Sequence, residues 1–214
     1  MRKANDGLRK LVVLLITAAG TVTPCFSAEP GWTSVQNVVN VFSRNNVDTS
    51  GYRSAGAYID YDSMAQRSLA AQWSKLTPKQ KHDYTAALRV LMEQRYYPRW
   101  HRIFSKAKVE YVSKSNADGD LLVKTNLLVG KKRDAMTWRL NDHNNKVISL
   151  AIGEKDLLER LTDRLQPRIK KSGFQSMLAW MQAHAKQAGE PAAQTSSAES
   201  VIGEMKGDGT AAEQ

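Results

Sequence analysis

The chain has 214 residues, of which 42% are hydrophobic and 24% are charged, as in an ordinary soluble globular domain. Its single cysteine excludes a disulfide framework, a CxxC redox pair and a cysteine-rich zinc site. The formal net charge of +10 favours anionic partners without naming one. Without the two end segments described next, about 160 residues remain, which is enough for one sizeable core but a tight fit for two.

Residues 1–28 are typical of a secretory signal peptide. Four basic residues precede a short apolar run from Leu11 to Ala19, and Pro24 and small residues follow it. The run is about half as long as the 20 apolar residues of a transmembrane helix. Cys25 lies in this segment, but the Leu and small residues usual before a lipidated cysteine are missing. We therefore predict an exported protein that keeps no cysteine once the signal is cut.

Residues 187–214 form a different kind of segment. They are rich in Ala, Gly, Ser, Thr, Gln and Glu and contain no aromatic residue, so we predict a disordered tail. The tail carries a formal charge of −4 and residues 1–28 carry +3, which leaves +11 on residues 29–186. We expect this basic body to contact anionic lipid headgroups or an acidic protein.

The first half of the body is predicted to be helical. Apolar residues recur at helical spacing over 33–44 and over about 62–73. The sequence Thr77-Pro78-Lys79-Gln80 is a capping box with proline at the first helical position. It predicts the start of a long helix over 77–104, which Pro98 is expected to kink at the preceding residue.

The hydrophobic period then changes to two, which is typical of strands. Four strands with short polar turns are predicted over 108–115, 121–129, 136–140 and 146–152. Apolar residues at helical spacing return over 157–169 and 174–181, with an interruption at Ser172-Gly173. The predicted class is therefore α+β, a four-stranded antiparallel meander packed against N- and C-terminal helices.

The sequence contains no recognisable catalytic or metal-binding motif. Its four histidines lack metal-ligand spacing and are expected on the surface: His82, His101, His143 and His184. GxSxG and a glycine-rich phosphate loop are absent. Basic and aromatic residues interleave over 95–102, but a helix divides them into an apolar and a basic face, which disfavours nucleic-acid readout. We predict no catalysis, cofactor or metal.

One segment is similar to a known protein family. Residues 59–103 carry an acidic-aromatic start, a Met-Ala helix, a small-residue pair and an aromatic, then the Thr-Pro-x-Gln cap and an apolar stripe. The matching residues are Asp62, Met64, Ala65, Ala70, Trp73, Thr77, Pro78, Gln80, Lys81, Leu91, Met92 and Tyr96. This pattern resembles the MlaC family, the toluene-tolerance auxiliary components of a Gram-negative ABC transport system for lipids.

The resemblance implies a soluble, monomeric carrier in the periplasm. Such a protein shuttles phospholipid between an outer-membrane lipoprotein complex and an inner-membrane ABC transporter complex, and so serves outer-membrane lipid asymmetry. The acyl chains would lie in an apolar cavity between the sheet and the helices. We expect ten residues to line it: Trp73, Leu88, Leu91, Met92, Tyr96, Val123, Leu127, Trp138, Leu157 and Leu161.

Two alternatives use the same apolar residues differently. An envelope interaction protein would pack them into a solid core. An enzyme with a cone-shaped α+β pocket would need a polar constellation inside it, and Thr125 and Ser149 are the only polar residues that the strand pattern places near the inner face.

Overall fold

The computed structural model describes residues 30–44, 49–153 and 156–188. The predicted signal peptide lies outside these residues. So does the predicted tail, apart from its first two residues, which end the last helix.

Helices form the first half of the described chain, as the hydrophobic pattern predicts. In chain order they are α1 (Pro30–Ser43), α2 (Thr49–Arg53), the 3-10 helix η1 (Ser54–Tyr58), α3 (Tyr61–Leu69), the 3-10 helix η2 (Ala70–Lys75), α4 (Pro78–Leu91), the π-helical turn η3 (Met92–Tyr96) and α5 (Tyr97–Phe104). The predicted capping box is present at α4. The Thr77 amide donates to Gln80 Oε1 at 2.9 Å, and Thr77 Oγ1 accepts from the Gln80 amide at 3.3 Å.

The chain departs from a regular α-helix next to Tyr97, where Pro98 is expected to disturb it. Pro98 is the second residue of α5, and its ring has no N–H to donate to the preceding turn. The irregularity lies just before it, in the π-helical turn η3, which adds about one residue to the helical repeat. The chain from α4 to α5 thus stays helical throughout and changes phase at η3.

Four antiparallel strands follow in the order β1-β2-β3-β4 and confirm the predicted meander. Their bounds are β1 (Lys108–Ala117), β2 (Asp120–Val129), β3 (Lys132–Asn141) and β4 (Val147–Ile152). The first hairpin turns at Asp118 and Gly119, whose φ angles of 55° and 75° are those of a tight two-residue turn.

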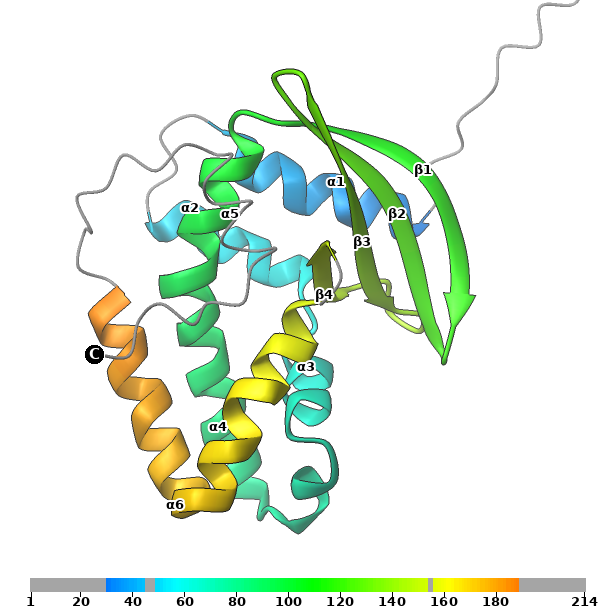
Figure 1. Ribbon diagram of the computed structural model, residues 1–214. Helices are drawn as coiled ribbons and strands as arrows, with labels where there is room; N and C mark the ends of the chain where they lie inside the picture. Colours follow the sequence, from blue (N-terminus) through cyan, green and yellow to red (C-terminus); the bar gives the residue numbers. More distant parts are fainter. Residues whose placement is uncertain (1–29, 45–48, 154–155, 189–214) are drawn as a thin grey trace, which may run out of the picture.

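The last helix, α6 (Leu157–Ala188), consists of two helical halves. Gly173 interrupts it with φ 80° and ψ 167°, a backbone conformation that favours glycine, at the place where the sequence predicts a break. The first half of α6 follows β4, and the second half turns back along α4 (Figure 1).

The sheet and the helices enclose one apolar core, which confirms the α+β class. The curved sheet lies over α1 at one end of the molecule, while α4 and α6 form the other end (Figure 1). The core includes buried residues of helices α1, α3, α4, α5 and α6 and of strands β2, β3 and β4. Residues of β1 such as Val109 and Tyr111 are partly buried and pack against this core.

Candidate functional site

The inner face of the sheet carries a continuous row of apolar side chains. Val123 of β2 is paired with Trp138 of β3, and Trp138 is paired with Leu150 of β4. Exposure of these three side chains does not exceed 2%. Because strand residues two apart share a face, Leu127 lies on the same side of β2 as Val123, as the alternation predicts.

Trp138 occupies the centre of this face and joins it to the helices. Its ring stacks on Phe104 of α5 with the ring centroids 5.8 Å apart. Its Nε1–H donates to Thr125 Oγ1 at 3.2 Å. The one polar atom of this large side chain is thereby satisfied inside an apolar layer.

All ten predicted lining residues belong to the apolar core or pack against it. Eight of them are at most 5% exposed and belong to one core: Leu88, Leu91, Met92, Val123, Leu127, Trp138, Leu157 and Leu161. Trp73 and Tyr96 are partly buried and pack against that core. The ten residues come from η2, α4, η3, β2, β3 and α6, so this one core spans helices and sheet, although more than eighty positions separate Trp73 from Leu161.

The two polar residues expected near the inner face both serve the fold. Thr125 accepts the Trp138 hydrogen bond and donates to the Met136 carbonyl at 3.4 Å. Ser149 Oγ accepts from the Leu158 amide at 3.0 Å and so caps an N–H at the start of α6. The polar constellation that a pocket enzyme would require is therefore not formed by this pair.

Two of the hollows on the surface of the described residues lie beside α4. The larger, about 700 Å³, lies between η1, α3, η2 and α4, and Trp73, Lys81, Arg89 and Lys146 are among its lining residues. The smaller, about 420 Å³, lies between α4 and the second half of α6 beside Val90. Of the ten predicted lining residues, only Trp73 contributes to either hollow.

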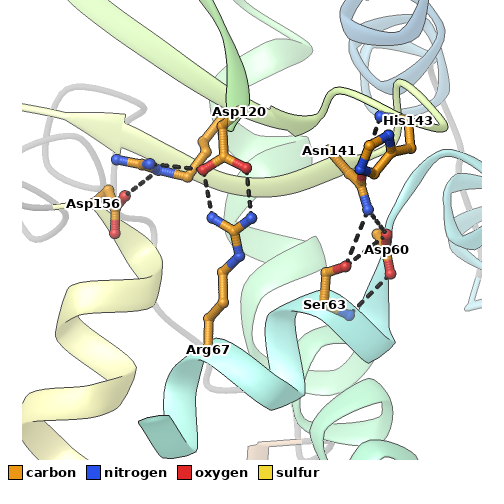
Figure 2. A network of polar contacts seen from close by, with 8 residues as sticks. Asp60, Ser63, Arg67, Asp120, Asn141, His143 and Asp156 are labelled. Atoms are coloured by element: carbon orange, nitrogen blue, oxygen red, sulfur yellow. Dashed lines mark hydrogen bonds and ion pairs between the residues drawn. The ribbon is translucent and has the colours of Figure 1, made fainter. Parts of the chain in front are cut away.

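An ionic cluster ties the sheet to α3 (Figure 2). The buried carboxylate of Asp120, at the start of β2, accepts hydrogen bonds from both Nη atoms of Arg67. It also accepts from Arg139 Nη1 at 2.8 Å, and Arg139 Nε lies 3.5 Å from Asp156. Burial opposes ionisation of Asp120, but the two arginines hold the pKa of its carboxyl below the ordinary 3.8.

A second carboxylate, Asp60, begins α3 beside this cluster (Figure 2). It accepts from the Ser63 amide at 3.0 Å and from the side-chain amides of Asn141 and Asn144 at 2.8 and 2.9 Å. Burial opposes its ionisation, yet these donors keep the pKa of Asp60 below 3.8. The end of β3 and the following turn are therefore fastened to the first turn of α3.

Sequence reasoning missed both acids. Asp60 followed by Ser63 is a signal for a helix N-cap that could have been found. Asp120 gives no comparable signal, because Arg67 and Arg139 lie 53 and 19 positions away in the chain.

Two of the four histidines differ from the expected surface position. His101 and His184 are partly buried, and each Nδ1 lies within 3.0 Å of a backbone carbonyl oxygen, that of Phe42 and that of Trp180. His82 and His143 are exposed. Within the described ranges, no three His, Cys, Asp or Glu side chains gather to hold a metal ion.

Buried hydroxyl groups on α3, α4 and α5 are paired with one another. Tyr61 OH contacts Tyr97 OH, and Tyr84 OH lies 2.7 Å from Ser68 Oγ. Burial raises the pKa of all three tyrosines, that of Tyr61 to about 12.

Two buried nitrogens of α5 are an exception to this pairing. Trp100 Nε1 and Arg102 Nε have no hydrogen-bond partner in the part of the chain that the structure describes.

Comparison with solved structures finds six matching chains. One is a phospholipid-binding protein from Ralstonia solanacearum, solved in complex with a phospholipid. It matches with a TM-score of 0.65 and 17% sequence identity, over 75% of this chain and 97% of that chain. At this identity the likeness shows that the two proteins share a fold.

Comparison of the sequence alone identifies a protein family. No curated protein sequence matches the chain. In the described residues, no helix is both long enough and apolar enough to cross a membrane. The protein family described as MlaC protein matches residues 51–183, from α2 to the second half of α6. Because this match spans more than half of the chain, the protein belongs to the MlaC family.

Proposed function

We propose that this protein is a periplasmic lipid carrier. It binds the acyl chains of a phospholipid between sheet and helices and passes the lipid between an outer-membrane lipoprotein complex and an inner-membrane ABC transporter complex. One observation carries the proposal: the fold is that of a protein solved with a phospholipid, matched over 97% of that chain. Membership of the MlaC family supports it.

The chemistry of the interior suits acyl chains. The ten lining residues offer apolar side chains from both layers, and Trp138, the largest of them in the sheet, already has its polar atom satisfied. Burying two chains of about sixteen carbons each is worth roughly 24 kcal/mol gross, at about 0.8 kcal/mol for each CH₂. Leaving a bilayer costs the same amount, so a carrier needs an apolar interior of its own and receives lipid while docked.

The interior has to open for the lipid to enter, since eight of the lining side chains are closed against one another. The Asp120 ion pairs and the Asp60 hydrogen bonds fasten one end of β2 and β3 to α3. We therefore expect the sheet to separate from the helices at the end away from these anchors, near the turn between β2 and β3.

The deciding experiment is extraction of the purified protein with organic solvent, followed by mass spectrometry of the extract. We expect phospholipid at close to one molecule for each chain. A protein that carries none, and takes up none when incubated with phospholipid vesicles, would contradict the proposal and favour the solid-core alternative.

A charged substitution in the interior locates the lipid. Leu127→Asp places a carboxylate among the proposed lining residues, and a cavity that opens to water can hydrate it. We expect the variant to fold and to purify without lipid. Val112→Asp is the matched control, because Val112 is a strand residue with 52% exposure. A folded Leu127→Asp protein with a full complement of lipid would remove Leu127 from the site.

Docking of the carrier is expected to depend on salt. The charge of +11 on residues 29–186 suits an anionic membrane surface or an acidic partner, and such attraction is screened over about 8 Å at physiological ionic strength. Binding to the membrane complexes, measured by surface plasmon resonance at rising salt, should weaken. Binding that does not change would show an apolar interface instead.

A further inference from the structure

The indole N–H of Trp100, on α5, is a buried hydrogen-bond donor that the protein leaves without an acceptor. The side chain is 1% exposed, and Nε1 has no hydrogen-bond partner among the described residues. Most buried polar groups in proteins are paired, because an unpaired one costs the free energy of its lost hydration. A ligand that brings an acceptor into the core would recover this cost.

The groups around this indole pack against it but do not replace an acceptor. The ring of Phe42, on α1, stands at 90° to it with the centroids 5.5 Å apart, and the ring of Tyr97 lies 5.6 Å away. A ring face accepts a hydrogen bond only weakly. The Tyr97 hydroxyl is already engaged with that of Tyr61. The N–H group is therefore enclosed by aromatic rings, neither of which is a strong acceptor.

Trp138, which is also fully buried, has the opposite arrangement. Its Nε1–H donates to Thr125 Oγ1 at 3.2 Å within the same apolar core. The two indoles are linked through Phe104, which stacks on Trp138 and lies one helical turn from Trp100 on the same face of α5. The unpaired donor therefore lies close to the proposed lining residues, although it is not one of the ten.

Trp100 also lies toward the end of the sheet that is expected to open. Helix α5 ends at Phe104 and leads into β1, whose first residue, Lys108, pairs with Leu128 beside the turn between β2 and β3. The ion pairs of Asp120 fasten the opposite end of β2. A phospholipid that enters at the open end with its chains first would leave its glycerol esters near this end, while the chains reach deeper.

We propose that Trp100 Nε1–H donates a hydrogen bond to an ester carbonyl oxygen of the bound phospholipid. This inference rests on the proposed carrier function and adds to it a residue that determines specificity. The ester carbonyls are good acceptors that a diacyl lipid carries between its charged headgroup and its apolar chains, so they suit a donor inside an apolar core near the entrance. A lipid with ether-linked chains keeps the phosphate and the apolar chains but has no such carbonyl.

Arg102 Nε, the other buried nitrogen that lacks a partner among the described residues, is not part of this site. It belongs to a side chain that is partly exposed. Residues two positions apart on a helix do not face each other, so Trp100 and Arg102 point in different directions.

The test compares two phospholipids that differ only at the ester carbonyls. The dissociation constants of dioleoyl phosphatidylglycerol and of its diether analogue are measured on the delipidated full-length protein. We expect the wild type to bind the diester about tenfold more tightly than the diether. Trp100→Phe keeps an aromatic ring but loses the N–H. It should weaken binding of the diester by about tenfold and leave binding of the diether unchanged.

Trp180→Phe is the matched control. It makes the same change at a partly exposed indole of α6, outside the ten proposed lining residues. This variant should therefore keep the preference of the wild type for the diester.

Nuclear magnetic resonance of the wild type gives a second measurement, which decides the proposal even if Trp100→Phe fails to fold. An indole proton moves downfield when it enters a hydrogen bond. We therefore expect a larger downfield shift of the Trp100 indole proton with the diester than with the diether, while the Trp180 signal is the same with both. Equal shifts of the Trp100 proton with the two lipids would overturn the proposal.

The outcomes separate the ester hydrogen bond from the carrier function. A wild type that binds both lipids equally well would overturn the hydrogen bond and leave the carrier intact. So would a Trp100→Phe variant that weakens both lipids equally, because the phosphate and the chains, which the two lipids share, would then account for the loss. A wild-type protein that binds neither lipid would overturn the carrier function itself.

Discussion

Two pairs of arginines differ in whether an acidic side chain lies beside them. At the anchored end of the sheet, Arg67 and Arg139 share the buried carboxylate of Asp120, and Arg139 also reaches Asp156. On the η3–α6 face, Arg95 and Arg164 have no carboxylate partner within the residues that the structure describes. All four side chains are arginines, so the difference between the two places is the presence or absence of an acidic partner.

The comparison separates paired from unpaired charges in this fold. A cation whose acceptor belongs to the protein stabilises the folded chain. A partly buried cation without such an acceptor gains no comparable stabilisation. The Asp120 cluster should therefore contribute more to the free energy of unfolding than Arg95 or Arg164.

Removal of the shared acid should have the largest effect on stability. Asp120→Ala leaves Arg67 and Arg139 facing each other, although both arginines are about one third exposed, so we expect a loss of about 2–3 kcal/mol. Urea denaturation followed by circular dichroism measures it. Asp83→Ala, which breaks the exposed 2.6 Å pair with Lys79, is the control and should cost less than about 0.5 kcal/mol. Equal losses of unfolding free energy in the two variants would show that Asp120 does not fasten the sheet to α3.

Replacing single arginines tests the comparison directly. Arg67→Gln takes one partner from a buried carboxylate and should lower the free energy of unfolding by about 2 kcal/mol. Arg95→Gln removes a dehydrated charge without an acid partner and should change it by no more than about 0.5 kcal/mol. Thermal and urea unfolding of the two variants, side by side, would break the comparison if Arg95→Gln lost as much as Arg67→Gln.

Acid should weaken the anchored end. The pKa values of Asp120 and Asp60 are lower in the folded protein than the ordinary 3.8. Their contribution to the free energy of unfolding is therefore complete above that value. It is lost as the pH falls below about 4 toward the folded pKa. We expect a flat contribution between about pH 5 and 8, and a shallower acid loss in Asp120→Asn than in the wild type. An unchanged acid slope in Asp120→Asn would show that other groups govern it.

Trp100 and Trp138, which are both buried, allow the same comparison for uncharged hydrogen-bond donors. We expect the smallest difference in stability here. Trp138 Nε1 has an acceptor in Thr125, whereas Trp100 Nε1 has none among the described residues, and both side chains are at most 1% exposed. Because the loss of packing is similar, Trp138→Phe should cost about 1 kcal/mol more than Trp100→Phe. Differential scanning calorimetry of both variants checks the order, and a reversed order would contradict it.

Features that depend on near neighbours in the chain could be predicted from the sequence. The capping box at Thr77, the alternation that places Val123 and Trp138 on one face, and the break at Gly173 are all found in the structure. Each depends on a periodicity or a backbone preference that operates over a few residues.

Features that depend on distant partners could not be predicted. The acceptor role of Asp120 requires Arg67, 53 positions away, and no spacing rule connects them. The π-helical form of η3 could not be predicted, because Pro98 indicates an irregularity near Tyr97 without specifying its geometry. The candidate lining residues were chosen for their apolar faces, and such faces look the same whether they close a core or line a lipid.

The π-helical turn η3 also has an evolutionary consequence. It is equivalent to one residue inserted into a helix that would otherwise continue unchanged from α4 into α5. Deleting one residue there would rotate α5 by about 100° relative to α4, turning Trp100 and Phe104 away from the core. A homologue without the insertion is therefore expected to show an alignment gap at residues 92–96 and to carry its inward aromatic residues in a shifted phase. Insertions and deletions in this family should be tolerated in turns such as that between β2 and β3, and selected against in this single helical turn.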